Sequence, residues 1–213
     1  MNTHDLSELR VLLSTGSPLS PQSFDYVYEK VKRDIHLASI CGGTDIISCF
    51  MGGVPILPVW RGEIQAPGLG MKVEVFDDTG QVASVEPGEL VCTAAFPSMP
   101  IYFWNDDSGE KYRAAYFNVY PNIWRHGDWV SFTEHGGMVV YGRSDATLNP
   151  GGVRIGTAEV YRQVEQLEEV LEGLVVGQQW ENDTRIILFV ILRSGYTLNE
   201  ELIKRIREKL RSG

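Results

Sequence analysis

A glycine-rich pentapeptide is the first part of this sequence whose residue types could do chemistry. It reads Cys41-Gly42-Gly43-Thr44-Asp45 and follows a short apolar run. The two glycines can expose backbone N–H groups to an anion, Thr44 adds a hydroxyl, and the Asp45 carboxylate is a ligand of the kind that Mg²⁺ takes. The same residues also suit an ordinary tight turn, because glycine tolerates positive φ and aspartate caps turns. The spacing alone leaves both interpretations open.

Two other segments could contact a ligand. Gly16-Ser17-Pro18 lies in "STGSPLS", which is similar to a phosphate loop but lacks a second glycine and the lysine, so a P-loop is excluded. Asp128, in "WRHGDW", could accept hydrogen bonds from two adjacent sugar hydroxyls. A turn aspartate is the simpler interpretation of the same residue.

The longest candidate segment is "GRSDATLNPGGVRIGTAEV", residues 142–160. It places Arg143 and Arg154 close to an aspartate and a glycine pair, and an arginine can bind phosphate as a bidentate fork. These arginines stand out because the formal net charge of the chain is −9. An acidic chain is a poor general partner for nucleic acid, which needs a basic face. We therefore expect a small anionic ligand that is bound by locally placed donors.

The composition limits the remaining classes of function. The 213 residues suffice for one large domain or two small ones, and 43% of them are hydrophobic. Three cysteines without C-x-x-C spacing argue against disulfides or a zinc site and favour a cytoplasmic location. The histidines are scattered, and His126 and His135 have no obvious nucleophile as a partner, so no catalytic triad is predicted. No apolar run approaches the roughly 20 residues of a membrane span.

The elements that must position these residues change in character along the chain. Residues 9–15 and 35–40 have strand patterns, and a helix between them begins at Pro21 with Ser20 as N-cap, which indicates a parallel α/β unit. From residue 71 to 141, short strands alternate with turns. This pattern predicts antiparallel, barrel-like β structure.

The last third of the chain has the pattern of a small α+β unit. Thr157 is a candidate helix cap, and residues 171–179 and 184–192 are predicted strands, the second apolar enough to be buried on both faces. Thr197-x-x-Glu200 predicts a capping box at the start of the last helix. The fold class is therefore α/β and α+β. Three parts are predicted, a partial α/β subdomain, a β-rich part, and a hinge with an incomplete small α+β domain: residues 1–70, 71–144 and 145–213.

Taken in order, four segments resemble the motifs of the adenylate-forming acyl-CoA synthetases. They are "GGTD", "GEL" at Gly88–Leu90, "HGDW" and "GRSDATLNPGGVRIGTAEV". Asp45 stands where the family usually has glutamate. The resemblance implies an AMP-forming acid–CoA ligase, in which a carboxylic acid attacks ATP to give an acyl-adenylate and pyrophosphate, and the CoA thiol then displaces AMP. Longer segments such as "FWNDDSGEKYRAAYF" are most similar to members that act on acetoacetate.

The resemblance also implies a role for each candidate residue. The substrates would be the small molecules ATP, CoA and acetoacetate, with Mg²⁺ as the metal and no tightly bound prosthetic group. The nucleotide would be bound by Gly16, Ser17, Pro18, Gly43, Thr44, Asp128, Arg143 and Arg154. Asp45 would bind Mg²⁺, Asp145 would be the hinge, and Gly151 and Gly152 would line the CoA tunnel. The lysine that drives adenylation is expected downstream, so no catalytic residue is assigned in this chain.

Two features of the family have no match here. These are the Ser/Thr/Gly-rich loop that holds the ATP phosphates, expected upstream, and the lysine-bearing loop near the C-terminus. The resemblance therefore implies an internal segment that is inactive alone and would need the missing part of the same enzyme as its partner. Two alternatives stay open: a truncated non-catalytic protein with residual nucleotide binding, and a ligase for another short-chain acid.

Overall fold

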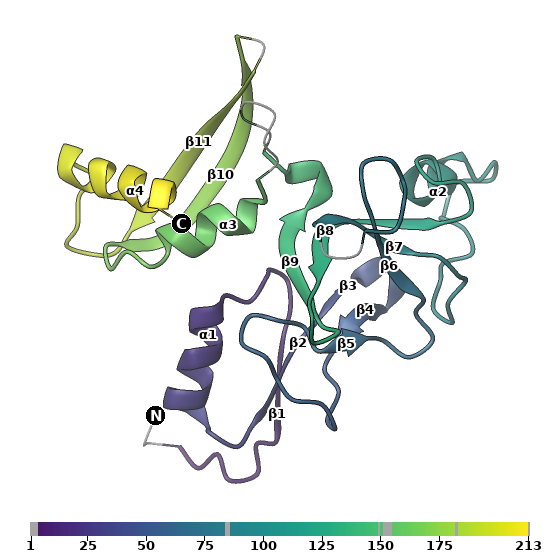
Figure 1. Ribbon diagram of the computed structural model, residues 1–213, viewed down its shortest axis with the longest axis horizontal. Helices are drawn as coiled ribbons and strands as arrows, with labels where there is room; N and C mark the ends of the chain where they lie inside the picture. Colours follow the sequence, from purple (N-terminus) through teal and green to yellow (C-terminus); the bar gives the residue numbers. More distant parts are fainter. Residues whose placement is uncertain (1–3, 84–85, 149, 151–154, 182, 213) are drawn as a thin grey trace. The chain divides into compact units, whose positions relative to one another are not determined.

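The computed structural model describes residues 4–83, 86–148, 150, 155–181 and 183–212. The chain divides into two units, Met1–Val140 and Tyr141–Gly213, whose helices and strands are drawn in Figure 1. Each unit has a hydrophobic core of its own. The predicted mixture of α/β and α+β structure is confirmed, since parallel and antiparallel strand pairs both occur together with helices. The predicted domain boundaries at residues 70 and 144 stay predictions.

The first elements form the predicted parallel α/β unit. Strand β1 (Val11–Ser14) lies parallel to β2 (His36–Ser39), and helix α1 (Pro21–Tyr26) continues into the π-helical turn η1 (Val27–Val31). Ser20 is the N-cap of α1, and its hydroxyl accepts a backbone N–H of the first turn at 3.3 Å. Apolar residues of the helix pack with residues of both strands.

A small antiparallel sheet follows β2. Its strands lie in the order β3 (Cys41–Gly43), β4 (Ser48–Gly52) and β5 (Ala66–Pro67). The 3₁₀ turn η2 (Thr44–Ile46) joins β3 to β4, and Ile47 completes the reversal in the left-handed region at a φ of 50°. The Gly-Gly-Thr-Asp segment therefore runs from the end of a strand into the tip of a hairpin.

The β-rich part is a four-stranded antiparallel sheet. Its strands lie in the order β6 (Val73–Phe76), β7 (Gly88–Cys92), β8 (Trp124–Phe132) and β9 (Met138–Arg143). The antiparallel prediction is confirmed, but the barrel-like prediction is wrong: within the described residues the order ends at β6 and β9 and no closed barrel forms. Short strands separated by turns occur in open sheets and in barrels alike, so their pattern does not distinguish the two.

Aromatic rings hold the helix α2 (Glu110–Tyr116) against this sheet. Trp124 on β8 is 1% exposed and lies edge-to-face against Phe96, with ring centroids 5.3 Å apart. Tyr116, the last residue of α2, stacks on Trp124 with centroids 3.6 Å apart. Each aromatic pair stabilises by about 0.5–1.5 kcal/mol beyond its buried area. The end of α2 is therefore firmly placed relative to β8.

The second unit is a β-hairpin whose core is completed by two helices (Figure 1). Strand β10 (Val170–Trp180) pairs antiparallel with β11 (Asp183–Leu192), and α3 (Thr157–Val164) and α4 (Glu200–Ser212) pack on them. The 3₁₀ turn η3 (Ser144–Ala146) precedes these elements. Among the helices that the structure describes, none combines the length and the apolar character that crossing a membrane requires.

Three local predictions in this unit are wrong. Phe189 and Ile191 are 57% and 54% exposed, so β11 is covered on one face and not on both. An apolar composition counts residues but does not say whether a second layer exists to cover them. The N-cap of α3 is Gly156, with Thr157 as the first helical residue. The cap of α4 is Asn199, whose Oδ1 accepts a first-turn N–H at 2.9 Å.

Candidate functional site

The Thr44–Asp45 turn lies at the surface, and its geometry depends on the glycine before it. Both side chains are exposed on η2. Gly43 has a φ of −148°, which any residue adopts, so its backbone does not require glycine. A Cβ at Gly43 would instead overlap Asp45 Oδ1 and would lie 3.1 Å from His126 Cε1. The absence of a side chain at this position therefore lets a carboxylate and an imidazole approach the same stretch of backbone.

The Asp45 carboxylate has a hydrogen-bond donor on each oxygen. The hydroxyl of Tyr116 donates to Oδ2 at 2.6 Å, and the backbone N–H of Ile46 donates to Oδ1 at 3.1 Å. Burial, together with the neighbouring carboxylate, raises the pKa of Tyr116, so its hydroxyl stays protonated and donates. Sequence reasoning missed Tyr116, because 71 residues separate it from Asp45. The only available signal was the aromatic-rich segment in which it lies.

The "GEL" segment holds the backbone that precedes Asp128. Glu89 on β7 is 5% exposed and accepts hydrogen bonds from the Gly127 N–H at 2.8 Å and from Arg125 Nε at 2.9 Å. The pairing of β7 with β8 shifts register between Glu89 and Val91. Gly127 has a φ of 87°, which favours glycine. The Glu89 side chain thus replaces a backbone hydrogen-bond partner of Gly127 at the point where the pairing of the two strands is irregular.

Asp128 lies inside β8 and is 9% exposed, so the simpler prediction of a turn aspartate is wrong. The Cys41 thiol donates to Asp128 Oδ2 at 3.1 Å, and His126 Nε2 lies 3.5 Å from the same oxygen. A buried carboxylate needs such polar neighbours, because desolvation of its charge is costly. Sequence reasoning did not connect Cys41 with Asp128, since 87 residues separate them.

Strand β3 brings the two predicted carboxylates to one region of the first unit. Its first residue, Cys41, bonds to Asp128, and its last residue, Gly43, is in close contact with Asp45 and His126. Three residues of one short strand thus connect an exposed carboxylate with a buried one. The arrangement offers an exposed carboxylate, Asp45, and a buried one, Asp128, as hydrogen-bond acceptors, together with the hydroxyl of Thr44 at the surface.

The predicted Gly16-Ser17-Pro18 loop begins one residue beyond Thr15, which follows β1. Gly16 has a φ of 92° and no atom within 4 Å of the position of a Cβ, so its backbone conformation, and not space, favours glycine. The backbone N–H of Ile40 donates to the Ser14 carbonyl at 3.0 Å. The start of the loop therefore lies beside the residue that leads into β3, at the carboxyl ends of two parallel strands, where ligands often bind.

In the second unit, the predicted site residues Arg143 and Asp145 form an ion pair with each other. Arg143 Nε lies 3.4 Å from Asp145 Oδ1, and the two side chains are 51% and 68% exposed. The other predicted residues of this segment, Arg154, Gly151 and Gly152, lie outside the described residues. The structure therefore connects Asp45 with Asp128 through β3 in the first unit, and the roles of the candidates in both units stay predictions.

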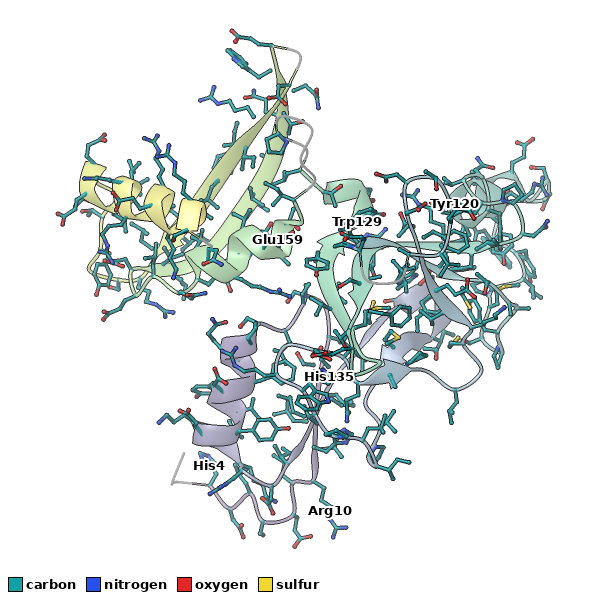
Figure 2. All side chains as sticks on the ribbon, viewed as in Figure 1. His4, Arg10, Tyr120, Trp129, His135 and Glu159 are labelled. Atoms are coloured by element: carbon teal, nitrogen blue, oxygen red, sulfur yellow. The ribbon has the colours of Figure 1, made fainter. Side chains whose placement is uncertain are left out.

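His135, the second histidine considered in the sequence, contacts Trp60 and Glu63. His135, labelled in Figure 2, stacks on Trp60 with ring centroids 3.8 Å apart, and its Nδ1 lies 3.0 Å from Glu63 Oε1. These contacts join the β8–β9 turn to the segment before β5. In the part of the chain that the structure describes, no three His, Cys, Asp or Glu side chains converge to hold a metal.

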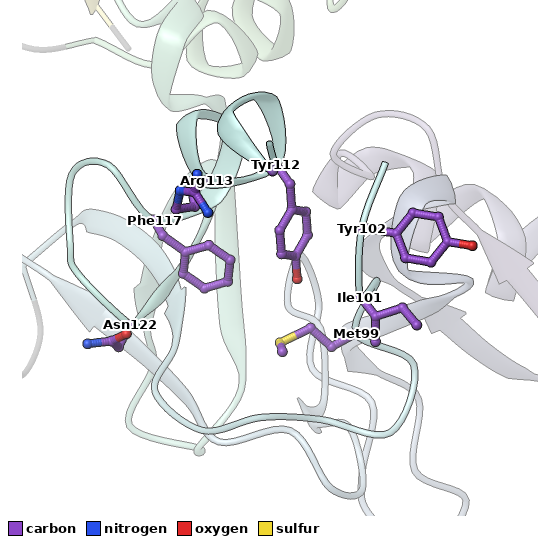
Figure 3. A pocket seen from close by; sticks show the side chains of 8 residues that line it. Met99, Ile101, Tyr102, Tyr112, Arg113, Phe117 and Asn122 are labelled. Carbon is purple, nitrogen blue, oxygen red and sulfur yellow. The ribbon is translucent and has the colours of Figure 1, made fainter. Parts of the chain in front are cut away.

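A cavity of about 490 Å³ lies beside α2. Figure 3 shows Tyr112 and Phe117 among its lining, with Met99 and Ile101 on the facing segment. The Tyr112 hydroxyl donates to the Pro100 carbonyl. None of the predicted site residues lines this cavity.

Comparison with known proteins gives a consistent picture. No protein-family model matches the chain. Acetoacetyl-coenzyme A synthetase of Rhizobium meliloti (strain 1021) is 62% identical over 211 residues, which are 99% of this chain and 32% of that protein. Acetoacetyl-CoA synthetase of Gallus gallus is 51% identical over 211 residues, 98% of this chain and 32% of that protein.

Solved structures agree with these relatives. Acetoacetyl-CoA synthetase from Streptomyces lividans superposes with a TM-score of 0.87 at 45% identity, over 99% of this chain and 32% of that one. The anthranilate CoA ligase AuaEII, in complex with anthranoyl-AMP, shares the fold with a TM-score of 0.80 at 23% identity, over 98% of this chain and 39% of that one. The resemblance to acyl-CoA synthetases is thus confirmed: in sequence and in fold, the chain matches a segment of the acetoacetyl-CoA synthetases that makes up about one third of their length.

Proposed function

We propose that this chain supplies part of the nucleotide site of an ATP-dependent, AMP-forming acid–CoA ligase that acts on acetoacetate. The observation that carries the proposal is its 62% identity, over 99% of its length, to a protein named acetoacetyl-coenzyme A synthetase. In that reaction a carboxylate oxygen of the acid attacks the α-phosphorus of ATP, and pyrophosphate leaves. The CoA sulfur then attacks the acyl carbon of the adenylate, and AMP leaves.

Asp128 is proposed to bind the ribose of the nucleotide. A carboxylate can accept one hydrogen bond on each oxygen, which matches two adjacent hydroxyls. Cys41 and His126 contact Oδ2 of this side chain and restrict its orientation. A group fixed before the ligand arrives loses little conformational entropy on binding, which favours affinity. Gly16, Ser17 and Pro18, at the ends of the parallel strands, would contact the base.

Asp45 is proposed to hold Mg²⁺, with Gly43 and Thr44 near the phosphate. Mg²⁺ prefers oxygen ligands and is usually bound by one or two carboxylates together with substrate phosphates and water. An exposed carboxylate with a single donor on each oxygen fits that requirement. When bound, the metal would neutralise phosphate charge. The chain's own contribution is to orient the carboxylate and to present the Thr44 hydroxyl.

The second unit is proposed to contribute contacts during the later steps. Arg143 and Arg154 would contact ribose and phosphate, Asp145 would act as the hinge, and Gly151 and Gly152 would line the path of CoA. These assignments rest on the motif of residues 142–160. The cytoplasmic location predicted from the cysteine pattern belongs to the same proposal.

Nucleotide binding by the full chain tests the site. We expect ATP with Mg²⁺ to bind in isothermal titration, and Asp128→Ala to weaken binding by about tenfold to a hundredfold, since a hydrogen bond to a charged group contributes about 1.5–3 kcal/mol. Asp25→Ala is the matched control, because it removes an exposed carboxylate on α1 that pairs with Arg61. Equal affinity of the two variants would overturn the assignment of Asp128.

Segment replacement tests the reaction. The corresponding third of the Rhizobium meliloti synthetase would be exchanged for this chain, and acetoacetate-dependent ATP–pyrophosphate exchange would be measured. We expect exchange within about tenfold of the parent enzyme, because core substitutions that keep volume cost little. The chain by itself should give none. Exchange that responds only to a different short-chain acid would overturn acetoacetate as the substrate.

A further inference from the structure

The hydrogen bond from the Tyr116 hydroxyl restricts the Asp45 carboxylate, although Tyr116 lies outside the "GGTD" motif. An ionised carboxylate offers about four lone-pair positions for hydrogen bonds or cations. The Tyr116 hydroxyl and the Ile46 N–H use one on each oxygen of Asp45. About half of the positions are thus engaged by the protein, and these bonds determine the direction in which the others point.

The two partners of this bond differ in how firmly they are held. Asp45 is an exposed side chain on the three-residue turn η2, where a side chain with nothing to hold it samples several staggered rotamers. Tyr116 is half-buried and lies nearly parallel to the buried Trp124, at an interplanar angle of 15°. Phe103 and Tyr112 also contact its ring edge-to-face, at 5.7 and 5.6 Å. The rigid partner therefore sets the orientation of the mobile one.

The helix that carries Tyr116 is itself anchored. Asp106 is 8% exposed and accepts hydrogen bonds from the backbone N–H groups of Tyr112, at 2.9 Å, and Lys111, at 3.2 Å. These bonds satisfy donors of the first turn of α2, which has no helical partners for them. Both ends of α2 are therefore fixed, one by Asp106 and the other by the stack on Trp124.

We propose that Tyr116 is a positioning residue for Asp45: its hydroxyl, fixed by the aromatic core, holds the carboxylate in the rotamer that presents its remaining lone pairs to a magnesium–phosphate group. This inference rests on the proposed function of Asp45. Asp45 is one methylene shorter than the glutamate that is usual in the family. A fixed donor to its Oδ2 therefore defines how far the carboxylate extends. Tyr116 itself does not contact the nucleotide in this proposal.

The test compares two hydroxyl deletions on the same helix. Tyr116→Phe keeps the ring and its stack but removes the bond to Asp45, and Tyr112→Phe removes a neighbouring hydroxyl that bonds to Pro100 instead. For each full chain, titration calorimetry would give the Mg²⁺ concentration that half-saturates ATP binding, and the affinity for AMP without metal. We expect Tyr116→Phe to raise the half-saturating Mg²⁺ concentration about tenfold, the effect of one hydrogen bond to a charged group.

The same variant should leave AMP affinity without metal within about twofold, and Tyr112→Phe should change neither quantity. In an Asp45→Asn background, Tyr116→Phe should have little further effect, because the two changes remove one interaction. Equal magnesium dependence in the Tyr116→Phe and Tyr112→Phe chains would overturn the inference. It would also be overturned if Tyr116→Phe weakened AMP binding as much as it weakens binding of ATP with Mg²⁺. Failure of the unaltered chain to bind ATP with Mg²⁺ would instead overturn the proposed function.

A measurement on the unaltered chain keeps the test independent of folding in a variant. In the NMR spectrum, the Tyr116 ring signals should move when ATP and Mg²⁺ are added together and should move much less with AMP alone. Tyr112 provides the internal reference. Shifts of Tyr116 no larger than those of Tyr112 would contradict a positioning role.

Discussion

The candidate residues of the two units are held in place by different kinds of contact. In the first unit, Asp45 and Asp128 are bonded to residues 71 and 87 positions away in the chain, Tyr116 and Cys41. In the second unit, Arg143 forms an ion pair with Asp145, two residues away, and both side chains are more than half exposed. The first group is therefore preorganised by its unit's core, whereas the Arg143–Asp145 pair depends on a local contact at the surface.

The largest expected effect is a loss of the core that supports the first group. Trp124→Ala should lower the free energy of unfolding of the first unit by about 3–5 kcal/mol, the usual cost of truncating a buried aromatic residue. It removes the stack on Tyr116 and the contacts with Phe96. Denaturant unfolding followed by circular dichroism would measure it.

Trp180→Ala is the control for that prediction, since it makes the same change at a residue that is 51% exposed at the end of β10. Its cost should stay below about 1 kcal/mol, as for most surface substitutions. Similar losses at both positions would contradict the role of the buried Trp124 ring in the core of the first unit.

A smaller loss is expected in the core of the second unit. Leu202 on α4 is 4% exposed, and Leu202→Ala should cost about 2–4 kcal/mol of unfolding free energy through lost contacts and a cavity. Leu198, just before the helix, is 54% exposed, so Leu198→Ala should change stability by about 0.5 kcal/mol or less. The same denaturant experiment measures both. An equal response would indicate that α4 does not complete the core of the hairpin.

Local patterns predicted the elements well where one contact pair decides the structure. Ser20 and Pro21 correctly mark the start of α1, because the N-cap bond and the restricted φ of proline act within one turn. The strands from residues 9–15 and 35–40 pair in parallel as predicted. Alternation and turns likewise predicted the antiparallel sheet, but not whether it closes.

The site was harder to predict because its decisive contacts join distant parts of the chain. Nothing in the spacing of "GGTD" indicates that a tyrosine 71 residues later will bond to the aspartate. The burial of Asp128 also depends on the Cys41 thiol, 87 residues away, which lies outside the "HGDW" segment. The two-sided burial predicted for residues 184–192 failed for a related reason, since burial depends on a partner layer that the strand's own residues do not encode.

Space at Gly43 offers a test that separates binding from stability. A Cβ there would displace the end of the Asp45 side chain, which is flexible, so Gly43→Ala should lower the free energy of unfolding by only about 1 kcal/mol. Displacement should break the bond with Tyr116, and we expect about tenfold weaker binding of ATP with Mg²⁺ in titration calorimetry. Gly173→Ala in β10 is the control, because a Cβ there would meet its neighbours at 3.6 Å or more. Unchanged binding by Gly43→Ala would contradict a preorganised Asp45.

The smallest expected effect is on the free energy of unfolding in acid, where one carboxylate from each unit can be compared. Backbone N–H donors of α2 lower the pKa of Asp106, and a hydrogen bond from Arg205 lowers the pKa of Glu169. A carboxyl group whose pKa is lower in the folded state stabilises the fold above its unfolded pKa, about pH 4, and this stabilisation is lost as the pH falls through the folded pKa.

Asp106→Asn and Glu169→Gln should therefore each reduce the slope of unfolding free energy against pH between pH 5 and 3. Added salt should reduce the contribution of the Glu169–Arg205 pair, whose arginine side chain is 47% exposed, more than that of Asp106, because salt screens charges that are accessible to solvent. Slopes that match the unaltered chain, or a larger salt effect on Asp106, would contradict this difference between backbone and ion-pair stabilisation.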